Sequence, residues 1–301
     1  MDMKLKDIIE GCLLGDGCIE NKVDKYFYFK VSARDEKFVE WIKQLLENFN
    51  IHCWISHENK KLYSAGFYIN TCSYNELLLL ERKWYKKGEK RRIKIVPSDL
   101  KLTPTTLLFW YLGDGSLIRR KDDTARVPHI SLATNSFSKE EVEFLKNRLK
   151  EDLGLNFYIV SNTTSTGFRK TIKTEYTLRS KVQDGTPFKF FKLIGLECPK
   201  EIANCITGSK GGSLHYFKDK WPNEEDWVRI LSNVKEIGPI LRKRRLELNL
   251  SQNQLGKIVG IRRENVRDVE LMKRNFCAAN FRKILNALNL NVFDLLKSLA
   301  S

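Results

Sequence analysis

Two aspartates, Asp16 and Asp114, stand in the same local sequence in different parts of the chain. Residues 9–17 read Ile-Glu-Gly-Cys-Leu-Leu-Gly-Asp-Gly, and residues 107–115 read Leu-Leu-Phe-Trp-Tyr-Leu-Gly-Asp-Gly. An apolar run closed by glycine predicts a buried helix, so each carboxylate is expected at a helix C-terminus, where the macrodipole is already negative. If the two helices pack side by side, the carboxylates repel one another. A divalent cation with oxygen ligands would relieve both problems.

The glycine after each aspartate, Gly17 or Gly115, is expected to end its helix at a positive φ, a conformation that costs glycine little. A single Gly-Asp-Gly is more often a helix stop followed by a turn. Two occurrences, each after an apolar run and each opening a similar downstream pattern, favour a paired site instead.

Composition indicates an intracellular protein that binds a polyanion. The 301 residues carry a net charge of +16 and a pI near 9.5, which makes nucleic acid the first candidate partner, although a ribosomal or membrane-surface protein would also fit. We expect no membrane association, because the sequence contains neither a long apolar segment nor an apolar signal core. The seven cysteines are scattered and form no C-x-x-C pair, so neither a disulfide framework nor a zinc site is predicted.

The elements around the two aspartates repeat in order. The periodicity predicts, in the first half, a helix at 7–15, strands at 26–32, 51–56 and 62–71, and helices at 35–48 and from about 74. The second half predicts a strand after Asp114, strands at 127–133, 156–161 and 174–179, and helices behind Ser138 and at 187–194. Ser138 and Glu141 form a capping box. Each half therefore reads helix, two strands, helix, two strands, helix, which indicates an internal duplication.

The first repeated stretch resembles the LAGLIDADG motif of homing endonucleases over its whole length. The second resembles it within residues 102–116, in a form common in two-repeat members of that family. Phe109 departs from the pattern, since it stands where the motif's first glycine would fall, whereas Gly11, Gly15 and Gly113 fit close helix packing.

The resemblance implies an α+β fold with two pseudo-symmetric αββαββα repeats that form a DNA-binding saddle, followed by an all-α domain. The expected organisation is a first repeat at 1–103, a second repeat at 104–218, a linker at 219–236 and a helix-turn-helix domain at 237–301. The resemblance to homing endonucleases also implies a monomer that cuts both strands of a long double-stranded DNA target and leaves short 3′ overhangs. It further implies that the protein belongs to a mobile intron or an intein-like element.

The sheets are expected to contact DNA with side chains that combine phosphate-pairing charge and hydrogen-bonding tips. A single such residue is more often part of a solvated strand face, but together they predict a basic surface. The expected DNA-binding residues are Tyr28, Lys30, Lys61, Tyr63 and Tyr68 in the first half, and Arg119, Arg120, His129, Lys170, Lys173 and Arg179 in the second.

Metal-dependent phosphodiester hydrolysis is the chemistry that the resemblance implies. The expected metal ligands are Asp16, Asp114 and the backbone carbonyls of Gly15 and Gly113. Two or three Mg²⁺ ions are expected, with Mn²⁺ able to substitute and Ca²⁺ binding without supporting turnover. A lysine shortly before a proline often assists in this family, and Lys94, before Pro97, matches that position. In the second half the candidate is Lys210, with Lys192 as the next choice.

The last third of the chain resembles the Cro and xenobiotic-response type of helix-turn-helix. The matching text is Leu-Ser-Gln at 250–252 and Leu-Asn-Leu-Asn-Val at 288–292. The sequence departs from that family after Glu270, where a glycine is usual. The expected recognition-helix contacts to DNA are Arg262, Arg263, Asn265 and Arg267; the alternative is a small helical bundle with an ordinary charged surface.

Two functions fit these observations. The first is a site-specific, metal-dependent homing endonuclease. The alternative is a non-cleaving nucleic-acid binder of the same fold, such as an intron maturase or a transcription regulator. Both aspartates are present, and a binder would not need them, so the sequence favours the enzyme. A further idea is that the C-terminal domain regulates the protein's own promoter.

Overall fold

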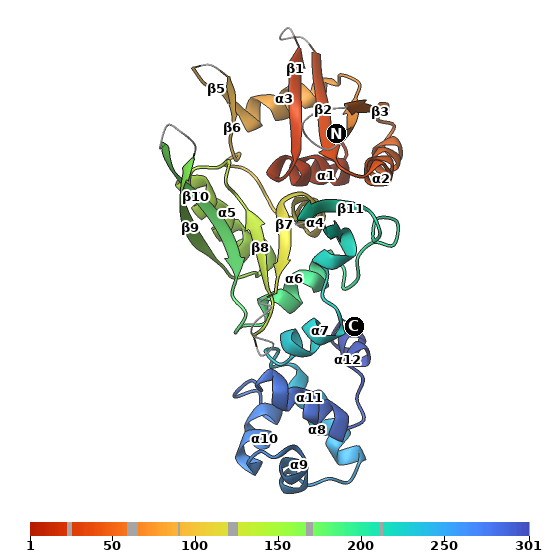
Figure 1. Cartoon of the computed structure of the whole chain (residues 1–301), viewed down its shortest axis with the longest axis vertical. Coiled ribbons are helices and arrows are strands. Elements are labelled where there is room, and N and C mark those ends of the chain that lie inside the picture. Colours follow the sequence, from red (N-terminus) through yellow and green to blue (C-terminus); the bar gives the residue numbers. More distant parts are fainter. Residues whose placement is uncertain are drawn as a thin grey trace. The chain divides into compact units, whose positions relative to one another are not determined.

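The computed structural model of the protein describes residues 1–22, 26–58, 66–89, 91–119, 126–166, 171–210 and 213–300 (Figure 1). These residues form two compact units. The first contains Met1–Ser116, Ser131–Arg179 and Ile194–Trp221. The second contains Leu117–Ile130, Ser180–Leu193 and Pro222–Ser301.

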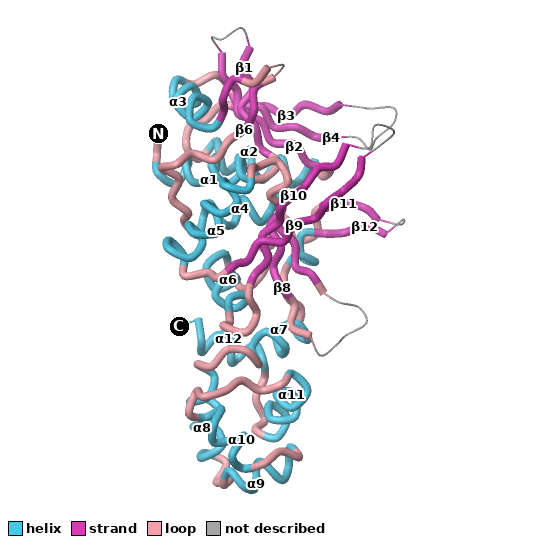
Figure 2. Tube along the Cα trace, turned by 90° about the vertical axis from the view of Figure 1, so that its left-hand side faces the viewer, coloured by secondary structure: helices cyan, strands magenta, loops and turns pink. Residues whose placement is uncertain are grey.

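The first repeat has the predicted order of elements. Its helices are α1 (Met3–Leu14), α2 (Glu36–Glu47) and α3 (Asn75–Trp84), and its strands are β1 (Gly17–Lys22), β2 (Tyr26–Ala33), β3 (Cys53–Glu58) and β4 (Gly66–Thr71). The antiparallel sheet has the order β1-β2-β4-β3. Alternate residues of β2, Phe27, Phe29 and Val31, are buried, and α1 and α2 lie to one side of this sheet in Figure 2. On the opposite face, called here the open face, Tyr28 and Lys30 are half-buried.

The second repeat follows the same plan. Its helices are α4 (Pro104–Asp114), α5 (Lys139–Leu153) and α6 (Thr186–Ile194), and its strands are β7 (Gly115–Ile118), β8 (His129–Ala133), β9 (Phe157–Thr166) and β10 (Thr171–Ser180). The sheet order, β7-β8-β10-β9, matches that of the first repeat. The predicted capping box of Ser138 and Glu141 begins α5. The duplicated αββαββα fold is therefore confirmed.

The predicted positive φ at the motif glycines is wrong. Among the described glycines, positive φ occurs at Gly154, Gly185, Gly195 and Gly260, and at neither Gly17 nor Gly115. Glycine is needed there because of space. A Cβ on Gly17 would lie 2.8 Å from the Cys12 carbonyl oxygen, and one on Gly115 would lie 2.0 Å from Tyr111 Cδ2. The strand that follows each helix turns back tightly against the helix's last turn.

Each repeat ends in a short hairpin that the sequence analysis did not predict. The first hairpin pairs β5 (Tyr85–Lys87) with β6 (Arg92–Lys94). The second pairs β11 (Ile206–Lys210) with β12 (Ser213–Tyr216) and continues into the short 3-10 helix η1 (Phe217–Lys220). Both hairpins belong to the first compact unit.

The C-terminal region is helical, as predicted. Its helices are α7 (Glu224–Leu231), α8 (Ile237–Glu247), α9 (Gln252–Val259), α10 (Arg263–Glu270), α11 (Ala278–Ala287) and α12 (Val292–Ala300). Much of the segment expected to be a linker is the helix α7, which is capped by Asn223 and buries Trp227. A buried, bidentate pair joins Arg245 on α8 to Glu270 on α10, with N–O distances of 2.6 and 2.9 Å.

The loop after Glu270 explains why a glycine is usual there. Met272 has a φ of +57°, a left-handed conformation that glycine adopts at less cost. The chain therefore makes the same turn with a less suitable residue. Separately, within the described parts of the chain, no helix has the length and apolarity needed to cross a bilayer.

Candidate active site

The two motif helices bring Asp16 and Asp114 together. α1 and α4 pack against each other, and their backbones come close at Gly15 and Gly113: a Cβ on Gly15 would lie 3.3 Å from Gly113 Cα. A Cβ on Gly113 would lie 3.1 Å from the Asp16 nitrogen and 3.7 Å from Asp16 Oδ2. Asp16 follows the end of α1 in a turn, whereas Asp114 is the last residue of α4. The two carboxylates thus come from the C-terminal ends of paired helices, as the sequence predicted.

A lysine neutralises the end of each motif helix. Lys94, the last residue of β6, donates from Nζ to the carbonyl oxygens of Leu13, Gly15 and Gly17 at 2.9, 3.2 and 2.8 Å. These contacts include carbonyls that a helix end leaves without a partner, and they place a positive charge at the negative end of the dipole.

Lys220 makes the equivalent contacts to α4. Its Nζ donates to the carbonyl oxygens of Tyr111, Leu112 and Gly113 at 3.2, 2.7 and 3.3 Å. The Tyr111 hydroxyl donates in return to the Lys220 carbonyl. The ammonium also lies 5.5 Å from the centre of the Phe217 ring. Lys220, at the end of η1, therefore occupies the place that Lys94 has in the first half.

The sequence analysis had assigned that place to Lys210. Lys210 ends β11, and its side chain is not among those described. Lys192 donates from Nζ to the carbonyl of Leu299, in the second compact unit. The sequence did contain a signal for Lys220, because it stands two residues before Pro222, much as Lys94 stands three before Pro97.

The electrostatics couple these four groups. Burial, and then the charge of Asp16, raise the pKa of Asp114 to about 6, although Lys94 and Lys220 act in the opposite direction. Burial lowers the pKa of Lys220 to about 8 and also lowers the pKa of Lys94, while the two aspartates oppose both shifts. For Asp114, Lys94 and Lys220, burial disfavours the charged form, and neighbours of opposite charge offset part of that effect.

The donor set fits a hard divalent cation that is shared with a substrate. Among the described residues, no group of three or more His, Cys, Asp and Glu side chains could hold a metal by itself. Mg²⁺ is usually bound by one or two carboxylates together with water and substrate phosphates, and two mutually repelling aspartates meet that requirement. The carbonyls of Gly15 and Gly113 were the other predicted ligands, and each already accepts a long hydrogen bond from a lysine.

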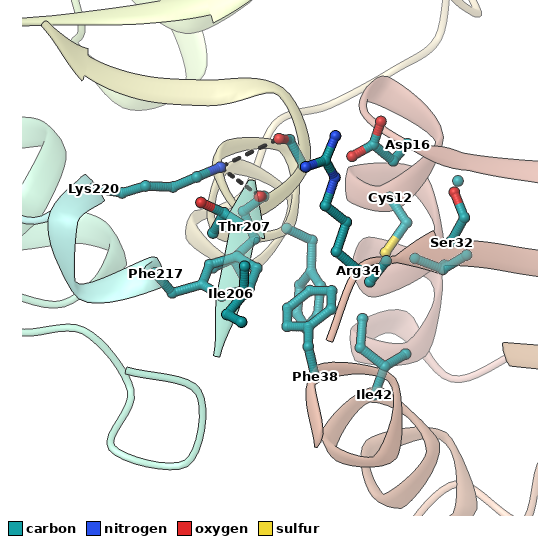
Figure 3. A pocket seen from close by; sticks show the side chains of 16 residues that line it. Cys12, Asp16, Ser32, Arg34, Phe38, Ile42, Ile206, Thr207, Phe217 and Lys220 are labelled. Atoms are coloured by element: carbon teal, nitrogen blue, oxygen red, sulfur yellow. Dashed lines mark hydrogen bonds between the residues drawn. The ribbon is translucent and has the colours of Figure 1, made fainter. Parts of the chain in front are cut away.

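A hollow of about 80 Å³ opens beside Asp16 (Figure 3). Gly113 and Lys220 line it, as does Arg34, whose guanidinium is directed toward Asp16 in Figure 3. Apolar side chains close its lower part, where the rings of Phe38 and Phe217 stack at 4.4 Å. The sequence analysis did not identify Arg34, which follows the end of β2 and carries no motif of its own.

Matching carboxylates hold the segments around the two lysine-bearing hairpins. Asp35, the N-cap of α2, accepts a hydrogen bond from the backbone of Ile206 at 2.7 Å, where β11 begins. Glu141, the capping-box residue of α5, accepts one from Val96 at 2.9 Å, two residues after Lys94. Each repeat thus fixes the chain next to the other repeat's hairpin.

The open face of the first sheet carries three of the predicted DNA-binding residues. Tyr28, Lys30 and Tyr68 alternate with buried residues on β2 and β4. Lys30 Nζ lies 3.0 Å from Glu20 Oε1 and 4.5 Å from the centre of the Tyr68 ring, so its charge is partly engaged within the sheet. Lys61 and Tyr63 lie outside the described residues.

The predicted DNA-binding residues of the second half differ from one another in their burial and in their partners. His129 and Arg179 occupy half-buried positions of β8 and β10. Arg119 Nε donates to Asp226 Oδ2 at 2.7 Å, and Asp226 is buried at the start of α7, so this arginine is engaged in a structural ion pair. Arg120 and Lys170 lie outside the described residues, and the side chain of Lys173 is not described.

The helix-turn-helix candidates fall into two groups. Arg262 and Arg263 are exposed at the N-terminus of α10, beside the capped start of α9 at Ser251. Asn265 accepts a hydrogen bond from Arg274 at 2.8 Å, and Arg267 pairs with Asp268 at 3.0 Å. The first two arginines are therefore the better placed to meet an anion.

Comparison with known families agrees with this geometry. The LAGLIDADG DNA endonuclease family profile matches residues 6–179, more than half of the chain. The chain belongs to this family. A helix-turn-helix profile matches residues 241–295, which correspond to the helices from α8 to α12.

A curated relative matches part of the chain. The protein MJ1098 of Methanocaldococcus jannaschii is 31% identical over 160 residues, which cover 52% of this chain and 59% of that protein. The chain thus spans less than two thirds of the length of this relative.

Two solved structures are also similar. The homing endonuclease I-WcaI, solved bound to its DNA recognition sequence, has 20% identity and a TM-score of 0.51, with 64% of this chain and 81% of that chain covered; this likeness shows the fold alone. Full-length DUF199/WhiA from Thermatoga maritima has 12% identity and a TM-score of 0.41, with 100% and 92% covered. The TM-score of the second structure is too low to support an argument about this chain.

Proposed function

We propose that this LAGLIDADG protein is a site-specific homing endonuclease that hydrolyses both strands of a long double-stranded DNA target and leaves short 3′ overhangs. The observation that carries the proposal is the duplicated acid and lysine arrangement. Asp16 and Asp114 adjoin, and Lys94 and Lys220 each bind three carbonyl oxygens at the end of a motif helix. A protein that only binds DNA would not need two equivalent charged centres at one seam.

The residues have distinct roles in the proposed reaction. Asp16 and Asp114 would hold divalent cations, which supply Lewis-acid activation of the phosphodiester and of water when bound. The ammonium groups of Lys94 and Lys220 would stabilise negative charge that develops on the phosphate oxygens. Because burial lowers the pKa of Lys220 to about 8, this residue is also able to exchange a proton near neutral pH.

Mg²⁺ is the proposed ion, with two or three ions bound. We expect Mn²⁺ to support cleavage and Ca²⁺ to support DNA binding without turnover. The protein is proposed to act as a monomer on DNA inside the cell.

The test is cleavage of a supercoiled plasmid that carries the DNA flanking the protein's own reading frame, joined across the insertion. With Mg²⁺, the wild-type protein should linearise the plasmid, and a chelator should abolish the reaction. Asp114→Asn and Asp16→Asn should lose cleavage while still shifting the DNA in a gel. Full activity of either variant would refute the assignment. Tight, site-specific binding without cleavage in Mg²⁺ or Mn²⁺ would establish the non-cleaving alternative.

We further propose that the helix-turn-helix domain adds DNA contacts through Arg262 and Arg263, which are exposed at the start of α10. The double substitution Arg262→Gln with Arg263→Gln should weaken DNA binding without lowering the melting temperature. Unchanged affinity would contradict this role. Binding of the protein to its own promoter, lost in the same variant, would show a regulatory use of the domain.

A further inference from the structure

The β5–β6 hairpin carries cationic side chains beyond the two that hold it in place. Two of its cations have structural partners: Arg92 pairs with Glu81, and Lys94 binds the end of α1. Lys86, Lys87 and Arg91 are exposed, and within the described part of the chain their side chains make no hydrogen bond or ion pair. These three residues have no evident role in stability.

The hairpin is held firmly against the edge of the first sheet. β1 is an outer strand, and its Ile19 directs both backbone groups away from β2. The Ile19 amide donates to the Tyr85 hydroxyl at 3.0 Å, and the Ile19 carbonyl accepts from Arg92 Nη2 at 3.1 Å. The Arg92 guanidinium also lies 4.9 Å from the centre of the Tyr85 ring. The free cations are thus presented from a preorganised position.

An open hollow lies between the hairpin, α3 and the outer ends of β1 and β2. It measures about 570 Å³, and Arg82, Lys86, Lys87 and Arg92 supply four of its lining residues, with Glu81 as the acidic one. Glu81 is already neutralised by Arg92, so the charge left in the hollow is positive. Closely spaced, unpaired cations next to a DNA-facing sheet fit a row of phosphates better than a single small anion.

The second hairpin carries less positive charge in its sequence. Residues 85–94 contain six lysines and arginines, whereas residues 206–216 contain one, Lys210. Lys218, beyond the second hairpin, is engaged with Asn204. The two repeats therefore differ at this edge although their catalytic lysines are equivalent.

We propose that the β5–β6 hairpin is a phosphate-binding element that extends the DNA footprint beyond the open face of the first sheet, on the first repeat's side only. The inference rests on the proposed DNA-binding function. Lys86, Lys87 and Arg91 contact the DNA backbone and contribute affinity without base specificity.

The salt dependence of DNA binding tests this inference. The triple variant Lys86→Gln, Lys87→Gln and Arg91→Gln is compared with wild type on a labelled duplex of mixed sequence, with chelator present, across about 50–200 mM salt. The slope of log K against log salt is negative, and each lost phosphate contact reduces its magnitude by about 0.9, so the magnitude should fall by about 2–3. The matched control removes the same charge from exposed lysines elsewhere in the first unit, Lys139, Lys150 and Lys200.

The outcomes are separable. A smaller slope in the hairpin variant and a wild-type slope in the control support the proposal. Equal slopes in both variants would overturn it, because the effect would then be one of net charge alone. A photoreactive benzophenone residue introduced at Lys86 should crosslink to the duplex, while the same residue at Lys139 should not; the reverse pattern would also overturn it. Failure of the wild-type protein to cut DNA would sink the nuclease assignment and leave this comparison intact.

Discussion

The two repeats place a lysine at the end of a motif helix in the same way, but with different local structure. In the first, the lysine ends a short hairpin strand, while in the second it lies four residues beyond the hairpin in η1. Lys94 and Lys220 nevertheless each bind three carbonyl oxygens at the end of a motif helix. The position of the ammonium is what the two halves share, and the segment that delivers it has diverged.

The two motif helices also carry residues of complementary size at equivalent positions. Gly11 on α1 and Phe109 on α4 stand equally far before their aspartates. A Cβ on Gly11 would lie 2.6 Å from the Thr106 carbonyl oxygen and 2.7 Å from Phe109 Cβ, so the large residue in one helix depends on the missing side chain in the other. The Phe109 ring also stacks on Trp41 at 5.8 Å.

Breaking that complementarity should have the largest effect. Phe109→Ala empties a buried site and should lower the free energy of unfolding by about 3–5 kcal/mol. Gly11→Ala overpacks the same contact and should cost about 1–3 kcal/mol. Urea unfolding followed by circular dichroism measures both. Wild-type stability in the Gly11 variant would show that the helices separate easily, contrary to the close packing described.

Removing either lysine should slow cleavage to a similar extent. Lys94→Met and Lys220→Met should each reduce the single-turnover rate of plasmid cleavage by about 10²–10³, because each removes a preorganised positive charge near the reacting phosphate. Lys210→Met is the matched control and should cut at the wild-type rate. The equivalence of Lys94 and Lys220 would be disproved if Lys210→Met abolished cleavage and Lys220→Met did not.

The Asp114 carboxylate should lower the stability of the metal-free protein at neutral pH. The pKa of Asp114 is raised to about 6, so its ionised form is disfavoured in the folded protein. The penalty is absent near pH 3, below both pKa values, where Asp114 is protonated in the folded and the unfolded state. It grows as the pH rises from about 4 toward 6 and is complete above that.

Asp114→Asn should therefore raise the free energy of unfolding by about 1–3 kcal/mol at pH 7.5 and leave it unchanged near pH 3, in the presence of chelator. Chemical unfolding at the two pH values gives the comparison. Adding Mg²⁺ should stabilise the wild type at pH 7.5 and reduce the difference in free energy of unfolding between the wild type and the variant. A variant that is less stable than wild type at pH 7.5 would contradict the assigned sign.

The smallest expected effect is the difference in stability loss between substitutions at two helix N-caps, Ser138 and Asp35. Ser138→Ala removes one N-cap hydrogen bond on α5 and should cost about 1 kcal/mol. Asp35→Ala removes the cap of α2 and also leaves the Ile206 amide without its acceptor, which should bring the total to about 2–3 kcal/mol. Thermal melts of the two variants test this, and equal losses would mean that the Ile206 contact contributes nothing.

Much of the fold could be predicted because hydrophobic periodicity marks each element in both repeats. The predicted strands and helices are present, and the capping box of Ser138 and Glu141 begins α5 as expected. The hairpins were missed because three-residue strands such as β5 and β6 leave no periodic signal. The φ of Gly17 was mispredicted because its role is to avoid the Cys12 carbonyl, a steric demand that appears only once the chain has turned back.

The site was predictable where local sequence fixes geometry. Asp16 and Asp114 follow directly from the motif. Lys220 lies 106 residues after Asp114 in the numbering, within the segment 219–236 that the sequence predicts to be a linker, so Pro222 alone marks it. Arg34 comes near Asp16 only through sheet pairing and the loop that follows β2, so nothing in its immediate neighbours identifies it.

The contacts of Tyr85 and Arg92 with Ile19 have a consequence for self-association. An outer strand with free amide and carbonyl groups is a template onto which a strand of another molecule can add. Here the two side chains occupy the outward-facing groups of Ile19, midway along β1, so an incoming strand would have to displace a hydroxyl and a guanidinium before it could pair. The hairpin thus acts as a cover that discourages edge-to-edge aggregation at this margin of the sheet.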